Sequence, residues 1–172
     1  MRTFHGKMVV SIKLEFLVQS NYYIFILPIS IFIMLFSLLG SKNMSDNKWK
    51  NKLSEKEYHV TRCGGTEPPF TGEYYKHDKN GTYNCNCCKK PLFNSEVKYD
   101  SGSGWPSFWD AIDHKNIKTK DDYSLGAKRI EILCANCDAH LGHVFEDGPN
   151  PTGMRYCVNS LSLDFKKEEK SD

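Results

Sequence analysis

The chain has 172 residues, enough for one domain with a hydrophobic core, with or without a short appendage. Its formal net charge is only +2, and charges of both signs are spread along it without a basic stripe, which argues against nucleic-acid binding. Four of the seven cysteines form two Cys-x-x-Cys pairs, which in a reducing compartment indicate a metal site and not disulfides.

Residues 1–43 form a hydrophobic N-terminal segment. Residues 22–40 carry no charged side chain and have the length and apolar character of a membrane-spanning helix, and basic residues precede them, as in a signal anchor. The lysines that follow favour a membrane-anchored protein whose folded part faces the cytosol. Alternatively, translation starts at Met44, which leaves a cytoplasmic protein. The sequence leaves both readings open.

Residues 44–168 are expected to form the folded domain, with 169–172 as a flexible tail. Residues 45–58 predict short helical pieces, because Trp49 and Leu53 lie four apart and Ser54-Glu55-Lys56-Glu57 fits a capping box. Glycines and prolines make residues 64–72 a loop, and Cys63, at its start, is expected near the surface and mobile.

Short strands separated by turns are predicted after this loop. The expected strands are residues 73–75, 83–85, 96–99, 129–133, 143–145 and 155–165. Many short strands with little helix indicate a mainly antiparallel β domain. In the last strand, alternation places Cys157 on a largely core face between Arg155 and Asn159. A guanidinium there would favour the thiolate; the alternative is a buried, inert cysteine.

The two Cys-x-x-Cys pairs supply four thiol ligands for one metal ion: Cys85, Cys88, Cys134 and Cys137. Four thiolates are the tetrahedral set of a structural zinc ion, and they leave no open position for water. Neither pair has the βαβ surroundings of a thioredoxin-like redox motif. Cys87 could compete for the ion, but the matching spacing of the pairs favours Cys88.

Two histidines and a glycine-flanked tryptophan are candidates for a pocket around Cys157. In His140-Leu141-Gly142-His143, the glycine offers a bend that could turn both imidazoles towards one site. Trp105 follows Gly-Ser-Gly in a loop, where an aromatic ring can line an apolar pocket. Together these groups indicate a small, partly apolar substrate that reacts with a thiolate.

With these motifs the chain resembles the B-type methionine-R-sulfoxide reductases, almost without gaps from about Tyr58 to Phe165. The motifs that carry the resemblance are Gly65-Thr66-Glu67-Pro68-Pro69-Phe70, the two cysteine pairs, Gly102-Ser103-Gly104-Trp105-Pro106-Ser107-Phe108, His140-Leu141-Gly142-His143-Val144-Phe145 and Arg155-Tyr156-Cys157-Val158-Asn159-Ser160.

The resemblance implies an oxidoreductase, a peptide-methionine (R)-S-oxide reductase, that repairs oxidised proteins during oxidative stress. It implies that Cys157 attacks the sulfoxide and becomes a sulfenic acid. Trp105 would pack on the substrate methyl group, and Phe145 would help to bind the substrate. The remaining implied site residues, which orient the substrate, activate its oxygen or flank the thiolate, are His140, His143, Asn159 and Arg155. Either histidine, or a water molecule, could donate the proton.

Ser103 departs from one common family pattern, in which a recycling cysteine stands between the two glycines. A serine cannot form that disulfide, and Cys63 is the best substitute. We therefore expect a Cys157–Cys63 disulfide reduced by a thioredoxin-like partner, with direct reduction by an external thiol as the alternative.

The expected fold is two small antiparallel sheets forming an open, tent-like barrel, stapled by one structural zinc ion, with short N-terminal helices and a monomeric state. A competing reading is a zinc-stapled β module that only binds a partner protein, with Cys157 as a core residue. The co-occurrence of Trp105, His140, His143 and Asn159 with that cysteine favours the enzyme, because zinc binding alone does not require them.

Overall fold

The computed structural model describes residues 48–169. The predicted membrane segment at 22–40 and the alternative start at Met44 lie outside these residues. From Trp49 onward the chain forms one compact unit. Within the described range, no helix has the length and apolar character needed to cross a membrane.

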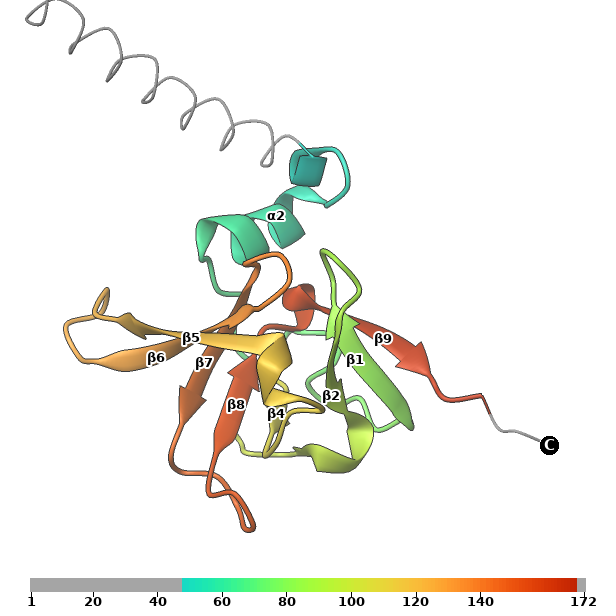
Figure 1. The fold of residues 1–172 in the computed structure, drawn as a ribbon, viewed down its shortest axis with the longest axis vertical. Coiled ribbons are helices and arrows are strands. Elements are labelled where there is room, and N and C mark those ends of the chain that lie inside the picture. Colours follow the sequence, from blue (N-terminus) through green and yellow to red (C-terminus); the bar gives the residue numbers. More distant parts are fainter. Residues whose placement is uncertain (1–47, 170–172) are drawn as a thin grey trace, which may run out of the picture. The chain divides into compact units, whose positions relative to one another are not determined.

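Helix α2 (Glu55–Cys63) packs against the sheets at the N-terminal side of this unit (Figure 1). The capping box is confirmed, because the Ser54 hydroxyl accepts from the Glu57 N–H and the Glu57 carboxylate accepts from the Ser54 N–H. The helix ends at Gly64, whose φ of 69° is the left-handed conformation typical of a C-terminal cap. Trp49 and Leu53, just before α2, are buried in the hydrophobic core.

Within residues 48–169, nine strands form two antiparallel sheets, which confirms a mainly β fold. The smaller sheet has the order β2-β1-β9 and comprises β1 (Gly81–Cys85), β2 (Pro91–Asn94) and β9 (Leu163–Lys167). The larger has the order β3-β4-β8-β7-β6-β5 and comprises β3 (Lys98–Tyr99), β4 (Ser107–Phe108), β5 (Ile117–Asp122), β6 (Arg129–Cys134), β7 (His140–Phe145) and β8 (Arg155–Val158). Both sheets keep free edges, so they do not close into a barrel.

Three predicted strands were wrong in detail. Residues 73–75 form a turn, and the segment 96–99 begins within a 3-10 helix, η1 (Ser95–Val97). The predicted strand 155–165 is interrupted by another 3-10 helix, η3 (Ser160–Ser162), so β8 and β9 belong to different sheets. The break is stabilised by a residue distant in the sequence, because the Glu67 carboxylate accepts from the N–H groups of the first two residues of η3.

The core lies between the two sheets and is rich in aromatic side chains. Phe93 of β2 stacks on Phe108 of β4 with ring centroids 4.4 Å apart. In β8 the fully or nearly buried residues are Tyr156 and Val158, so the alternate residues, including Cys157, point to the other side of the strand. The expectation that the Cys157 side is the core face was therefore wrong.

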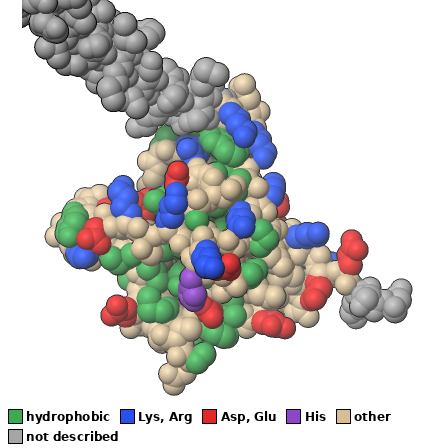
Figure 2. All heavy atoms as spheres, in the orientation of Figure 1, with side chains coloured by type: hydrophobic (Ala, Val, Ile, Leu, Met, Phe, Trp, Pro, Cys, Tyr) green, Lys and Arg blue, Asp and Glu red, His purple; other side chains and the backbone are tan. Residues whose placement is uncertain are grey.

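Charged side chains of both signs are interspersed on the face that Figure 2 shows. Elsewhere among the described residues, exposed ion pairs include Lys76 with Asp100 and Lys118 with Asp138. Exposed pairs contribute little to the free energy of unfolding, so the stability of the fold rests on the core and on buried hydrogen bonds.

Candidate active site

Cys157 lies near the centre of the larger sheet. Strand β8 pairs with β4 on one side and β7 on the other, and Cys157 stands opposite Ser107 and His143. Side chains that stand directly opposite each other in antiparallel strands share one face of the sheet. The pairing therefore brings a thiol and an imidazole to the same surface from residues far apart in the sequence.

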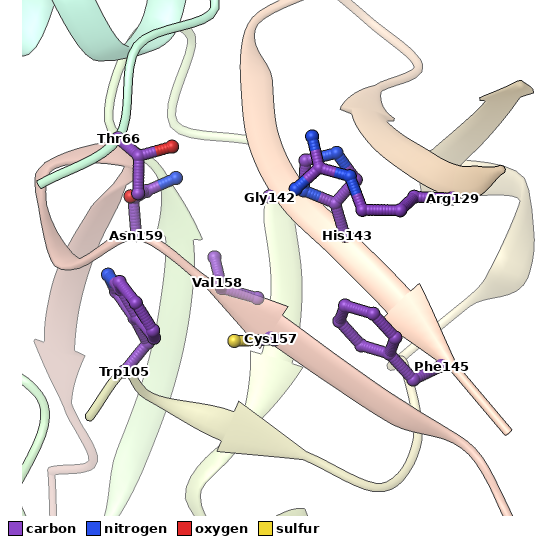
Figure 3. A pocket seen from close by; sticks show the side chains of 9 residues that line it. All are labelled: Thr66, Trp105, Arg129, Gly142, His143, Phe145, Cys157, Val158 and Asn159. Carbon is purple, nitrogen blue, oxygen red and sulfur yellow. The ribbon is translucent and has the colours of Figure 1, made fainter. Parts of the chain in front are cut away.

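A small pocket with a volume of ≈ 120 Å³ opens beside the Cys157 thiol (Figure 3). Its lining residues are Thr66, Trp105, Arg129, Gly142, His143, Phe145, Cys157, Val158 and Asn159. Trp105 forms one wall, while Arg129, His143 and Phe145 lie across the pocket from it, with the sulfur between them. An apolar side chain that carries one polar oxygen would match this mixed lining.

Burial raises the pKa of the Cys157 thiol above its ordinary value. The Ser103 hydroxyl, 3.8 Å from the sulfur, and the positive charge of Arg155 act in the opposite direction but do not outweigh burial. The expected guanidinium is therefore present and favours the thiolate, yet the resting group is a neutral thiol. A base must take the proton when the sulfur attacks.

Arg155 is fixed beside the site by two contacts. Its Nε and Nη2 donate to the two carboxylate oxygens of Asp147 at 2.8 Å each, in a bidentate pair. The guanidinium also stacks over the ring of Phe145, 4.4 Å from the centroid. Arg155 is not one of the residues that line the pocket, so it orients Phe145 and contributes its charge from the side.

His143 is held by a carboxylate from the neighbouring hairpin. Its Nε2 lies 2.8 Å from Asp122 Oδ2. Burial lowers the pKa of His143, and the nearby charge of Arg129 adds to this effect, whereas the Asp122 contact opposes it. The Ser124 N–H and the His143 contact hold the pKa of Asp122 well below its usual range. The carboxylate can thus only accept, which leaves Nε2 as the donor and Nδ1 as the free nitrogen of a neutral imidazole.

His140 occupies a different position. It is buried, its Nδ1 lies 2.7 Å from Glu131 Oε1, and its Nε2 has no hydrogen-bond partner among the described residues. The rings of His140 and His143 are in edge contact, with centroids 5.7 Å apart. Only His143 lines the pocket, so the bend at Gly142 does not present both imidazoles to the same space.

Asn159 and Trp105 are joined through the backbone of Glu67. The Asn159 side chain accepts from the Glu67 N–H at 3.1 Å and donates to the Leu141 carbonyl at 3.1 Å. The Glu67 carbonyl then accepts from the Trp105 indole N–H, also at 3.1 Å. Buried side-chain and backbone groups thus fix the angle of the tryptophan wall relative to β7 and β8. Asn159 borders the pocket, but its amide is already engaged within the protein.

Cys63 is exposed at the C-terminal end of α2 and does not line the pocket. The next residue, Gly64, has open space where a side chain would project, but its backbone N–H donates to the His59 carbonyl and holds the end of the helix. The loop beyond is anchored, since the Phe70 N–H donates to the Gly104 carbonyl at 2.7 Å. The structure therefore does not bring Cys63 to the pocket that holds Cys157.

The four cysteines of the two pairs form one cluster, with all four sulfurs within 4.8 Å of one another. The cross-pair distances are 3.7 Å for Cys85 to Cys137 and 3.6 Å for Cys88 to Cys134. Four metal–sulfur bonds of about 2.3 Å in a tetrahedron require sulfurs ~3.8 Å apart, so these two distances match a zinc site.

Both halves of this cluster use the same backbone turn. The Lys89 N–H donates to the Cys85 carbonyl, and the Asp138 N–H donates to the Cys134 carbonyl. Lys89 and Asp138 both have a positive φ, of 62° and 57°. Cys87 is fully buried, but it is not one of the four clustered ligands.

The sequence analysis missed several residues of the site, and four of them position its side chains: Arg129, Asp122, Glu131 and Glu67. The first three come from the β5–β6 hairpin and reach the histidines only because β6 pairs with β7. The spacing of Arg129 and Glu131, which places both on one face of a strand, is visible in the sequence. By itself this spacing does not indicate a function.

The profile of the SelR domain family matches residues 53–167. A peptide methionine sulfoxide reductase MsrB of Acinetobacter baylyi is 55% identical over 134 residues, which cover 78% of this chain and 96% of that protein. The corresponding protein of Thioalkalivibrio sulfidiphilus is 56% identical over 127 residues, covering 74% and 93%. Among solved structures, the Yippee-like domain of Mis18 is similar, with 15% identity, a TM-score of 0.44, and coverage of 54% of this chain and 100% of that chain.

Proposed function

The chain belongs to the SelR domain family of peptide methionine sulfoxide reductases, and from this membership we propose that it reduces the R epimer of methionine sulfoxide in oxidised proteins to methionine. The observation that carries the proposal is the pocket itself, in which the Cys157 thiol lies between the Trp105 wall and His143. The SelR match lies inside residues 44–168, which we propose as the catalytic domain.

In the proposed reaction, Cys157 attacks the sulfoxide sulfur. His143 takes the thiol proton on Nδ1 and passes it to the sulfoxide oxygen. The oxygen leaves the methionine sulfur and ends on Cys157, which becomes a sulfenic acid while methionine is released. Cys157 loses two electrons and the methionine sulfur gains two, and no proton is consumed. His143 is chosen over His140 because only His143 lines the pocket.

The remaining pocket residues bind and orient the substrate. The indole of Trp105 faces the space above the sulfur and would pack on the S-methyl group, with Phe145 on the opposite side. Asn159 positions this wall through Glu67, and Arg155 positions Phe145 and favours the attacking thiolate. His140 is held by Glu131 and contacts the His143 ring edge-on, so it would help to position His143.

Recycling of Cys157 is proposed to proceed through a disulfide with Cys63, which a thioredoxin-like protein then reduces. The Cys63 thiol attacks the sulfenic sulfur, and the oxygen leaves as water. The exposure of Cys63, at the end of α2, supports this step. Direct reduction of the sulfenic acid by an external thiol is the alternative if Cys63 does not reach Cys157.

One zinc ion is proposed to occupy the cluster of Cys85, Cys88, Cys134 and Cys137. Four sulfur ligands leave no position for a water or substrate, so the ion would stabilise the fold and take no part in the reaction. It would tie the β1–β2 turn of the smaller sheet to the β6–β7 turn of the larger one.

The decisive experiment measures turnover of the separated R and S epimers of N-acetyl-methionine sulfoxide by the full chain, with dithiothreitol as reductant. We expect reduction of the R epimer alone and its complete loss in Cys157→Ser. Absence of turnover by a folded, zinc-loaded protein would reject the reductase function and favour a module that only binds a partner protein. If Cys157→Ser still reduces the substrate, Cys157 is not the nucleophile.

A further inference from the structure

Arg129 lies in the pocket, and the proposed reaction does not yet use it. The side chain comes from the first residue of β6, and its guanidinium lies beside His143, across the pocket from Trp105 (Figure 3). A guanidinium stays charged at every physiological pH. A cation that is only partly exposed needs a partner, and the contacts of each edge of the guanidinium therefore matter.

One edge of the guanidinium is anchored on the hairpin. Arg129 Nη2 lies 2.5 Å from Asp122 Oδ2 and 3.3 Å from the Ser124 hydroxyl. The same Asp122 oxygen accepts from His143 Nε2 at 2.8 Å. Asp122 thus holds the cation and the imidazole in fixed positions relative to each other, on the same side of the thiol.

The Nε atom of Arg129 has no such anchor. It is buried and has no hydrogen-bond partner among the described residues. A buried N–H group without a partner is rare in folded proteins and costs free energy unless a ligand or a water molecule satisfies it. At the wall of a substrate pocket, this indicates a donor reserved for the substrate.

We propose that the Nε–H of Arg129 donates a hydrogen bond to the sulfoxide oxygen of the bound substrate, an inference that rests on the proposed reductase function. The S–O bond of a sulfoxide carries partial negative charge on oxygen, and this charge grows as the Cys157 sulfur attacks. A preorganised cation at that oxygen stabilises the transition state more than the ground state. Arg129 keeps its own protons, and His143 supplies the one that the oxygen takes up.

The same contact gives a physical account of epimer selection. The sulfoxide sulfur carries a methyl group, an oxygen and the remainder of the side chain, and it is attacked from the Cys157 side. With Trp105 holding the methyl group and Arg129 holding the oxygen, only one configuration at sulfur presents both groups correctly. Arg129 would then be a catalytic residue that also determines specificity.

The test compares Arg129→Met, Arg129→Lys and the wild-type full chain in single-turnover release of methionine from each N-acetyl-methionine sulfoxide epimer. We expect Arg129→Met to lower the rate for the preferred epimer about 10- to 100-fold, as for loss of one charge-assisted hydrogen bond, and to lower the preference for that epimer. Arg129→Lys retains the charge but not the Nε geometry, and should recover only part of the rate. Lys128→Met is the matched control, since it removes an exposed cation that pairs with Asp121.

Two measurements separate this role from an effect through His143. Added guanidinium ion should partly restore the rate of Arg129→Ala, which a merely structural role would not allow. If Arg129 acts only on the imidazole, the pH profile will shift while the plateau rate and the epimer preference stay unchanged. An unchanged plateau rate and preference in Arg129→Met would overturn the inference and leave the reductase intact. Failure of the wild-type protein to reduce either epimer would instead reject the proposed function.

Discussion

The Ser103 hydroxyl oxygen lies 3.8 Å from the Cys157 sulfur. Ser103 stands between Gly102 and Gly104, which both have positive φ, so the loop directs this one side chain at the thiol. The hydroxyl also belongs to a chain of serines in which Ser101 contacts both Ser103 and Ser107. The position nearest to the nucleophile is thus occupied by a group that can hydrogen bond to sulfur but cannot form a disulfide.

A cysteine at position 103 should be able to recycle Cys157 without Cys63. We expect Ser103→Cys in a Cys63→Ser background to form a disulfide with Cys157 after one turnover, because a small rotation of either side chain would bring the sulfurs into bonding range. Non-reducing peptide mass spectrometry would detect the linkage. The Cys63→Ser protein without the second change is the control, and it should accumulate sulfenic acid. If that control still recycles normally with thioredoxin, Cys63 is not the resolving thiol.

Alkylation of Cys157 should show the effect of burial on its pKa. Since burial raises the pKa, the thiolate fraction near neutral pH is small, and the rate with iodoacetamide should keep rising with pH to beyond the ordinary cysteine midpoint. Arg155→Met should move the midpoint higher still, because it removes a charge that favours the thiolate. Rates at the Cys157 peptide, followed by mass spectrometry from pH 6 to about pH 10, provide the measurement. A midpoint below that of an ordinary cysteine would contradict the neutral-thiol resting state.

Removal of single cysteines should distinguish metal ligands from Cys87. We expect Cys134→Ser to lose bound zinc and to unfold at a much lower temperature, because the proposed ion would link the two sheets and structural zinc contributes folding free energy directly. Cys87→Ala should keep one zinc per chain and lose only modest stability through a small cavity. Zinc content by mass spectrometry and thermal unfolding of both variants provide the comparison. Zinc loss in Cys87→Ala would instead make Cys87 a ligand.

Features determined by nearby residues could be predicted from the sequence. The capping box, the strands at residues 83–85 and 129–133, and the grouping of two cysteine pairs all follow from local spacing, and the structure contains them. By contrast, nothing within residues 155–165 signals the break at η3. That break depends on Glu67, which lies 93 residues before Ser160 in the chain.

The same distinction applies to the site. Cys157, Trp105 and His143 could be chosen because each carries recognisable chemistry in a recognisable motif, and the structure brings them to one pocket. Arg129 and Asp122 could not be chosen, because their importance arises from strand register. Asp122 stands opposite Arg129 in the β5–β6 pair, and only this pairing places both beside His143.

Glu67 offers a test of how the loop supports the pocket. Its buried carboxylate accepts from the N–H groups of Ser160 and Leu161 at 2.6 and 3.0 Å. In Glu67→Gln the new amide nitrogen must face one of these donors, so one hydrogen bond to a charged group is lost and one N–H is left unpaired. We expect a loss of about 1.5 to 3 kcal/mol in the free energy of unfolding, measured by urea titration.

Activity should fall together with stability, because the Glu67 carbonyl also accepts from the Trp105 indole N–H and a displaced loop would tilt the pocket wall. Glu73→Gln is the matched control, since Glu73 is exposed in the same segment and should tolerate the same change. If Glu67→Gln and Glu73→Gln have equal stability, the carboxylate does not stabilise η3. If Glu67→Gln loses stability but keeps full activity at a temperature where it is folded, then the position of Trp105 does not depend on the loop, and the tryptophan wall is set by its own glycine-flanked turn.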